Sequence, residues 1–564
     1  MANRNESGRF AQNPVASIGR SSFNRNSSIK TTFNAGDLIP FYVDEVLPGD
    51  TFSIDTSKVV RMQTPLTPIM DNIYLDTYYF FVPNRLVWKH WVNLMFENTE
   101  SAWAPESVYS VPQVTAPSGG WSVGTVADYM GIPTGVNGLS VNAMPFRAYA
   151  LICNEWFRDE NLQDPFNISV EDATLTGSNG SNYITDCQLG GKPFVAGKLH
   201  DYFTSALPAP QKGPDVEIPL LGSAMPVYSL DESTFPPPSG LNLGSMQFRV
   251  NAGDRTGKDY MTSFNMHRIS PDVNDFETSG VNQSFSSSSP SGSAASYIYP
   301  SSLWAVPSEA TMASINSLRL AFQAQKFFEK LARGGSRYIE SIKAMFNVTN
   351  PDYRLQRPEY LGGNRIPITI NQVVQQSASS ESSPQGTTTG QSLTTDIHSD
   401  FTKSFTEHGY IIGVMCARYN HTYQQGLSRM WTRKAALDFY FPVFANIGEQ
   451  PVLNQEIYAQ GSSVDKEVFG YQEAWAEYRY RPSICTGEMR STYAQSLDVW
   501  HLGDDYDSLP KLSPGWIQED KTNIDRCLAV TSANSNQFFA DIYVKNKTTR
   551  PMPLYSIPGL IDHH

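Results

Sequence analysis

Strand-like patterns occupy three consecutive stretches near the start of the chain, residues 38–50, 51–62 and 72–83. The first stretch ends in a Pro-Gly-Asp turn, and in the second Phe52 and Ile54 alternate with polar neighbours. In the third, the apolar positions that share one face at a period of two are Ile73, Leu75, Tyr79 and Phe81. Alternation bounded by turn residues is typical of antiparallel β-structure, which we predict here.

Strand patterns return towards the end of the chain. Residues 410–420 (YIIGVMCARYN) are apolar on both faces, as expected for a central, buried strand. Residues 538–545 alternate cleanly, with Phe538 and Ile542 on one face. Strands at both ends predict one antiparallel β domain in which the N- and C-terminal strands meet. We therefore predict a mainly β fold, an eight-stranded antiparallel jelly roll with long loop and helical insertions.

Helical periodicity marks four further stretches, residues 85–96, 145–157, 311–333 and 336–346. The second begins at Pro145, a favoured residue in the first turn of a helix, and the third is stopped by two glycines. The first two have wide apolar faces, which favours packing against the core over any binding role.

Changes in composition divide the chain. Residues 1–30 read as a basic arm without a packed element, and residues 31–200 as the first part of the jelly-roll core. Residues 201–300 hold eleven prolines and a Ser-rich end, which predicts a surface insertion that forms a protrusion. Residues 301–564 form the second part of the core, interrupted by a surface loop over 375–395, where fifteen of 21 residues are Ser, Thr or Gln.

Composition narrows the class of protein. Only 17% of the 564 residues are charged and 12% are aromatic, a balance typical of a surface hidden against partners. No apolar run is long enough to span a membrane, and the polar start has no signal-peptide pattern. The five scattered cysteines are expected to be free thiols of a chain made in a reducing cytoplasm.

Two basic regions stand out in a chain of net charge −13. The arm interleaves basic and aromatic residues suited to single-stranded nucleic acid, and its candidate contacts are Arg4, Arg9, Phe10, Arg20, Arg25 and Lys30. The helical region 311–357 offers Arg319, Lys326, Lys330, Arg333 and Arg337. For the arm, the alternative is an unstructured leader that is basic by chance. For the helices, it is ion pairing with acidic residues of other subunits.

The search for catalytic chemistry finds nothing. The segment GDRTGKD (253–259) departs from a phosphate-binding loop in spacing and in its last residue, so we interpret it as a turn. The terminal sequence Asp562-His563-His564 cannot place three adjacent side chains well around one metal ion. Asp504, Asp505 and Asp507 read as a solvated acidic loop. We predict no catalytic, cofactor-binding or metal-binding residue, and no enzyme.

Several long segments carry a family resemblance. They include NAGDLIPFYVDEVLPGDTF, PFRAYALICNEWFRDENLQDP, RLQRPEYLGG, FTEHGYIIGVMCARYNHTYQQGL, GYQEAWAEYRYRPS and IPGLIDHH. These segments resemble the major capsid protein of gokushovirus-type microviruses, small tailless bacteriophages with single-stranded DNA. The resemblance extends from residue 34 to 564. It implies a viral jelly roll, a T=1 icosahedral shell with one copy per asymmetric unit, and an insertion that projects towards the host.

The resemblance also implies partners. They are further copies of the chain, a circular single-stranded DNA genome on the inner face, and minor virion or DNA-binding proteins. A host surface receptor, such as a glycan, would meet the protrusion. The chain would be made in the bacterial cytoplasm and reside in the virion. The competing interpretations are a β-sandwich carbohydrate-active enzyme that uses Asp504 or Asp507, and a glycan-binding module.

Overall fold

The computed structural model describes residues 19–95, 97, 109–214, 216, 315–335, 337–377, 379 and 384–555, with short strands between 227 and 305. The chain divides into two compact units. The larger unit combines Met1–Lys212 with Glu329–His564, and the smaller unit is Gly213–Phe328.

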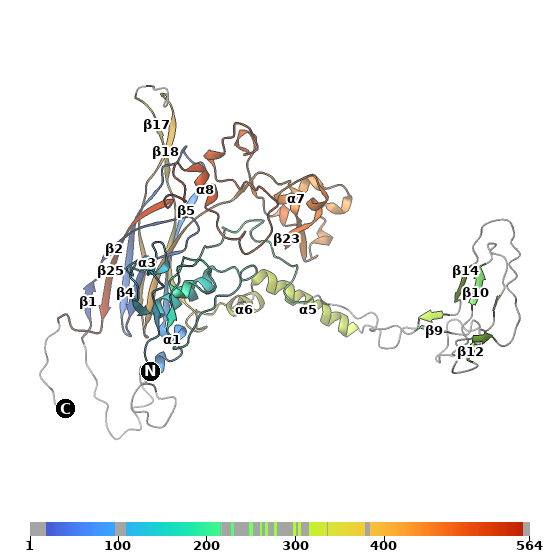
Figure 1. Ribbon diagram of the computed structural model, residues 1–564, viewed down its shortest axis with the longest axis horizontal. Coiled ribbons are helices and arrows are strands. Elements are labelled where there is room, and N and C mark those ends of the chain that lie inside the picture. The colour runs from blue at the N-terminus through green and yellow to red at the C-terminus, as the bar shows by residue number, and fades with distance from the viewer. Residues whose placement is uncertain are drawn as a thin grey trace, which may run out of the picture. The chain divides into compact units, whose positions relative to one another are not determined.

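The first large sheet of the larger unit joins the two ends of the chain (Figure 1). Its strands are β1 (Ser21–Asn24), β2 (Ser27–Phe33), β25 (Phe538–Arg550), β4 (Thr51–Met62) and β19 (Thr394–Ser404). The order is β1-β25-β4-β19, with β2 also pairing with β25, and every pair is antiparallel. The expectation that the N- and C-terminal strands meet is therefore confirmed.

The second large sheet has the order β16-β5-β20-β3 and is also antiparallel. Its strands are β16 (Glu359–Pro367), β5 (Ile73–Pro83), β20 (Gly409–Tyr419) and β3 (Ile39–Val46). The predicted central strand is β20, in which ten of eleven residues are buried. Although β3, β4 and β5 follow one another directly, β4 lies in the other sheet, so these strands are not neighbours in hairpins.

The two large sheets share one apolar core. Phe52 and Ile54 of β4 and Leu75 and Tyr79 of β5 contribute to it, as their alternation predicted. A hydrogen bond of 2.7 Å between the hydroxyls of Thr56 and Tyr79 links the sheets inside this core. The fold is thus mainly β, built from antiparallel sheets, and is compatible with a β-sandwich.

Helices cover the other face of the second sheet, where a second core lies. The helix predicted from Pro145 is α4 (Met144–Ile152), continued by a π-helical turn over Cys153–Phe157. The helix predicted over 85–96 is wrong as one element, because Trp88 takes an extended conformation between α1 (Asn84–Val87) and α2 (Trp91–Leu94). The remaining elements beside this face are α3 (Val126–Tyr129), β6 (Gln113–Thr115), β7 (Ser140–Asn142) and β8 (Leu175–Thr176).

A third core forms among the loops that follow β20. Its framework includes β21 (Thr422–Tyr423), β22 (Glu449–Leu453), β23 (Val468–Glu473), β24 (Ser483–Ile484), α7 (Asn454–Ile457) and α8 (Thr522–Cys527). Tyr202, Phe203 and Ala206 are buried in it. The surface insertion was predicted to begin at 201, and this start is wrong, because residues 201–206 fill a core whose other members lie far along the chain.

The smaller unit contains short strands and the first part of a helix. These are β9 (Val227–Ser229), β10 (Phe248–Asn251), β11 (Tyr260–Met261), β12 (Met266–Arg268), β13 (Phe276–Thr278), β14 (Tyr297–Pro300), β15 (Leu303–Ala305) and α5 (Ile315–Gly334). The division between the units falls within α5, after Phe328. The segment GDRTGKD lies outside the described residues.

Two other sequence predictions need correction. The absence of a packed element from residues 1–30 is wrong for β1 and β2, whose backbones pair with β25. The surface loop predicted over 375–395 is too long, because its last part forms β18 (Thr388–Ser392), which pairs with β17 (Ile370–Val374), and β19 begins at Thr394. This hairpin extends beyond the two large sheets at one end (Figure 1). The predicted helix over 336–346 is confirmed as α6 (Tyr338–Phe346).

Adjacent residues of β25 provide a test of the shared core. Phe538 is fully buried and stacks on Phe33 with ring centroids 5.3 Å apart, whereas Phe539 is 37% exposed. We expect Phe538→Ala to lower the free energy of unfolding by about 3–5 kcal/mol, because it leaves a cavity. The matched control Phe539→Ala should cost about 1 kcal/mol or less. Chemical denaturation of unassembled subunits measures both, and equal losses would contradict the assigned faces.

Candidate functional site

The basic residues predicted to contact nucleic acid are spread over several elements. Arg4, Arg9 and Phe10 lie outside the described residues. Arg20 is exposed just before β1, where it donates to the carbonyl of Gly49 at 2.5 Å and the hydroxyl of Thr51 at 2.7 Å. The N-terminal candidates that the structure describes therefore start at the edge of the first sheet.

The next two candidates differ in how much of their charge is available. The guanidinium of Arg25 donates two hydrogen bonds of 2.7 Å to the carboxylate of Asp44, a bidentate pair that joins the β1–β2 turn to β3. Lys30 is exposed and lies 3.6 Å from the carboxylate of Asp541, which is also exposed. Arg25 thus serves the fold, whereas Lys30 keeps a solvated ammonium group.

The helical candidates divide in the same way. Arg319, Lys326 and Lys330 are exposed along α5. The guanidinium of Arg333 pairs with Glu449. Arg337 donates at 2.9 Å to the backbone carbonyls of Asn154 and Arg158. Arg333 and Arg337 both line a depression of about 1090 Å³ in the larger unit.

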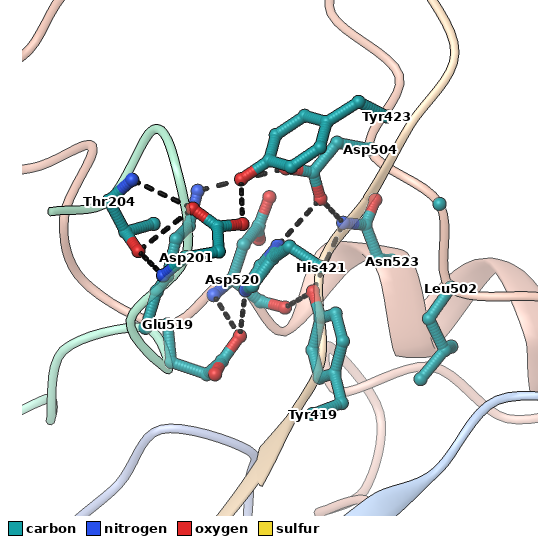
Figure 2. A network of polar contacts seen from close by, with 12 residues as sticks. Asp201, Thr204, Tyr419, His421, Tyr423, Leu502, Asp504, Glu519, Asp520 and Asn523 are labelled. Atoms are coloured by element: carbon teal, nitrogen blue, oxygen red, sulfur yellow. Dashed lines mark hydrogen bonds and ion pairs between the residues drawn. The ribbon is translucent and has the colours of Figure 1, made fainter. Parts of the chain in front are cut away.

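A cluster that sequence reasoning missed lies beyond the end of β20 (Figure 2). His421 is 5% exposed, and each of its ring nitrogens faces a carboxylate. Nδ1 lies 2.9 Å from an oxygen of Asp504, and Nε2 lies 3.0 Å from an oxygen of Glu519. Two acceptors on one imidazole require both nitrogens to carry protons, so the ring is an imidazolium.

Further contacts tie the cluster to its surroundings. Asp504 accepts hydrogen bonds of 2.7 Å from the amide of Asn523 and from the hydroxyl of Tyr506. The ammonium of Lys198 lies 4.0 Å from the same carboxylate. Nearby, the hydroxyl of Tyr419 donates to the carbonyl of Asp520 at 2.7 Å (Figure 2). One compact group of side chains thus joins β20, the loop after Leu502, the strand-free segment 513–521 and α8.

The pKa values in the cluster follow from burial and pairing. Burial alone would lower the pKa of His421, but Asp504 and Glu519 raise it to about 9. Burial alone would raise the pKa of Asp504, but the charge and hydrogen bond of His421, followed by Lys198, lower it to about 2. At neutral pH both groups are therefore charged, and the buried charges compensate one another.

The side chains of this cluster have a structural role. Both ring nitrogens of His421 are occupied, and its side chain has no exposure, so the imidazole cannot exchange protons with a bound substrate. The expectation of a solvated acidic loop is wrong for Asp504, which is 2% exposed, while Asp505 and Asp507 are exposed. Except for Tyr506, its partners lie far away in sequence, so no local pattern could have identified its burial.

Other candidate chemistry is limited in the described part of the chain. There, no group of three or more His, Cys, Asp or Glu side chains could hold a metal ion, and Asp562-His563-His564 lies outside it. All five cysteines are free and buried, and burial raises the pKa of Cys485 to about 11. Among the described helices, none has the length and apolar character needed to cross a membrane.

Comparison with known proteins gives consistent matches over almost the whole chain. A family model described as "Capsid protein (F protein)" matches residues 11–560. The chain is 40% identical to "Capsid protein VP1" of Chlamydia phage 1, over 98% of this chain and 97% of the relative. It is 41% identical to the protein of that name from Bdellovibrio phage phiMH2K, over 99% of both chains. For Spiroplasma virus 4 the identity is 44%, over 94% of this chain and 93% of the relative.

The buried cluster predicts a distinctive dependence of stability on pH. The folded pKa of His421 is raised from 6.5 to about 9, so its contribution is complete below pH 6.5 and is lost as pH rises through 9. The folded pKa of Asp504 is lowered from 3.8 to about 2, so its contribution is present above pH 3.8 and is lost as pH falls through 2.

We expect His421→Gln to destabilise the unassembled subunit by about 3–5 kcal/mol near pH 6, because it leaves two buried carboxylates without their cation. The wild-type subunit should lose stability as pH rises through 9 and His421 loses its proton, and the variant should not show this loss. Denaturant titrations across pH measure both effects. His398→Gln, at a half-buried histidine of β19, is the matched control and should retain the wild-type profile. An unchanged profile in His421→Gln would refute the assignment.

Proposed function

Because the chain belongs to the phage capsid protein (F protein) family, we propose that it builds a T=1 icosahedral shell with one copy per asymmetric unit. Family membership itself makes the chain a structural capsid protein of the virion, and the resemblance to gokushovirus-type microviruses is confirmed. The match over residues 11–560 carries the proposal. Electron microscopy of particles from infected cells tests it, and a shell of another symmetry would overturn it.

We propose that the two large sheets form an eight-stranded jelly roll. The strands β1 and β2 both pair with the same edge of β25, so together they fill one position, and each sheet then has four positions. Along the chain, consecutive strands of the two sheets change sheet at every step except between β5 and β16, which are neighbours. This strand order supports two interleaved Greek keys.

The alternative interpretations as an enzyme or a glycan-binding module have no support from the comparisons. The carboxylate of Asp504, a candidate for glycosidic chemistry, is occupied by His421 and Asn523. We propose that the chain has no catalytic role and is made in the bacterial cytoplasm. Its five free, buried thiols are consistent with synthesis in a reducing compartment.

We propose that the inner face of the shell contacts a circular single-stranded DNA genome through basic residues near the N-terminus. The proposal is supported by the five basic residues against one acidic residue in the first thirty, and by the exposure of Arg20 and Lys30. The exposed Arg319, Lys326 and Lys330 could contribute along α5, with intersubunit ion pairing as the alternative. Minor virion or DNA-binding proteins are further proposed partners.

Arg4→Gln combined with Arg9→Gln should lower genome retention and reduce its dependence on salt, because each basic residue that neutralises a phosphate adds to that dependence. Subunit stability should stay at the wild-type value. Arg25→Gln is the contrast: it breaks the bidentate pair with Asp44 and should cost about 1 kcal/mol of stability. Packaged DNA per particle and subunit unfolding are the measurements. Wild-type DNA content in the double variant would contradict contact by the arm.

We propose that the insertion forms a protrusion that faces the host and recognises a surface receptor such as a glycan. The chain division supports a separable insertion, with Gly213–Phe328 as its own compact unit. We therefore propose the bounds Gly213 and Phe328 for the insertion, in place of the bounds 201 and 300 that composition predicted. Insertions outside a rigid scaffold tolerate changes in length and often carry binding function. The alternative is a spacer that fills a gap between subunits.

Replacement of residues 281–296 by a short Gly-Ser link should leave shell assembly intact and reduce adsorption to host cells. Sedimentation measures assembly, and depletion of particles from a cell suspension measures adsorption. A wider deletion within Gly213–Phe328 that still adsorbs normally would exclude recognition. A deletion that abolishes assembly would favour the spacer.

A further inference from the structure

The larger unit exposes a long apolar stretch that its own fold does not cover. All ten residues of 434–443 (KAALDFYFPV) are exposed, although five of them are large apolar or aromatic residues. Within 427–447, the exposed large apolar side chains are Leu427, Met430, Trp431, Leu437, Phe439, Tyr440, Phe441, Val443 and Ile447. Val443 is 81% exposed, and Leu437 and Trp431 are 71% and 70% exposed. We call residues 427–447 the apolar segment.

The exposed area of this segment is large enough for an interface. A fully exposed aromatic side chain offers about 150–250 Å² and an aliphatic one somewhat less. At exposures of 38–81%, the nine side chains together leave an area on the order of 700 Å² in water. One partner in a standard protein interface contributes about 800 Å². The apolar segment therefore has the area of one side of a stable interface.

The apolar segment is also held in a fixed conformation. The carboxylate of Asp438 accepts hydrogen bonds from the backbone N–H groups of Lys434 and Ala435, at 2.7 and 2.8 Å. The guanidinium of Arg433 pairs with Glu477 at 2.9 Å and lies 4.4 Å from the ring centre of Tyr478. A surface that is ordered before binding loses less conformational entropy when a partner covers it.

The chemistry of the segment favours a dry contact. Between residues 435 and 447 the only charged side chain is that of Asp438, and its hydrogen bonds to the local backbone occupy it. Aromatic enrichment with few charges is the composition of interface cores. Hence a partner with an apolar surface fits residues 435–447, which offer no cation to a phosphate backbone.

We propose that the apolar segment is a contact between two copies of this chain in the shell. The inference rests on the proposed function and deepens it. Every copy carries the apolar segment, so the surface that covers it must be present once per chain. In a shell of identical subunits, the most abundant surface of this kind belongs to another copy of the chain. Heterologous contacts between identical subunits close into rings, which a shell requires around its symmetry axes.

Charged substitutions at the most exposed positions test the contact with little risk to the fold. We expect Leu437→Glu and Val443→Lys each to reduce the yield of shells by about tenfold or more, because a charge would be buried without a partner. Leu437→Met and Val443→Ile keep the apolar surface and are the matched controls, with shell yields near wild type. Virions from infected cells are quantified by sedimentation, and unfolding of the unassembled subunits is measured in parallel.

Normal unfolding of the charged variants together with loss of shells supports the proposal. Wild-type shell yields in both charged variants would overturn it while leaving the capsid role intact. Should the charged variants be misfolded, Val443→Cys provides an independent measurement, because all five native cysteines are buried. A maleimide should label this thiol in dissociated subunits and fail to label it in intact particles. Equal labelling in both would overturn the proposal.

Photo-crosslinking identifies what covers the segment. A benzoyl-phenylalanine in place of Phe441 preserves an aromatic side chain at a position that is 46% exposed. Irradiation of intact particles should give a crosslinked dimer of this chain. A crosslink to a minor virion protein or to DNA would overturn the assignment to a second copy. Absence of the chain from wild-type particles would instead refute the proposed function, so the two failures are distinguishable.

Discussion

The pairing of β25 with β4 and with the strands β1 and β2 is the constraint on which the larger unit depends. β25 is the last described strand, and its register runs from Phe538 opposite Met62 to Thr549 opposite Thr51. Because the first and last strands share one sheet, each insertion between the strands leaves the two sheets and returns to them. Long loops and a separate unit can then be added at strand ends without changing the ladder. The alternate residues of β25 close the shared core, as the stacked rings of Phe33 and Phe538 illustrate.

The loops that follow β20 have little regular structure, so polar contacts fix their positions. The imidazolium of His421 between Asp504 and Glu519 joins segments that no strand ladder connects. Burying these charges is costly, and their mutual pairing, the nearby ammonium of Lys198 and the hydrogen bonds of Asn523 and Tyr506 compensate for it. Such a cluster specifies one arrangement of loops, because any other arrangement leaves a buried charge unpaired. These loops are thereby held in a defined arrangement.

Assembly into a shell gives a physical reason for the low charge and high aromatic content of the chain. In an isolated subunit the apolar segment 427–447 would promote aggregation, whereas in a shell the same side chains provide the free energy of association. The contacts of Arg433 and Asp438 fix this segment before any partner arrives. Rigid presentation favours one docking geometry, and a closed shell needs one repeated geometry.

The sequence alone determined the features that depend on local periodicity. Alternation located β5 and β25, two apolar faces identified β20 as central, and a proline with a wide apolar stripe located α4. Long family segments also identified the class of protein, because they persist as residue strings and need no three-dimensional information. Each of these signals lies within about ten to twenty neighbouring residues, which is the range over which helix and strand patterns operate.

Only the tertiary structure decided which patterns meet. Both β3 and β4 carry a local strand pattern, yet they lie in different sheets, because the partner of a strand is set by distant residues. Asp504 has the sequence context of a solvated loop and is buried because His421 and Asn523 reach it from elsewhere in the chain. By composition, residues 437–444 resemble a buried strand, but residues 437–443 are exposed. Burial depends on long-range packing. A local pattern can make a segment suited to burial, but it does not identify the segment that covers it.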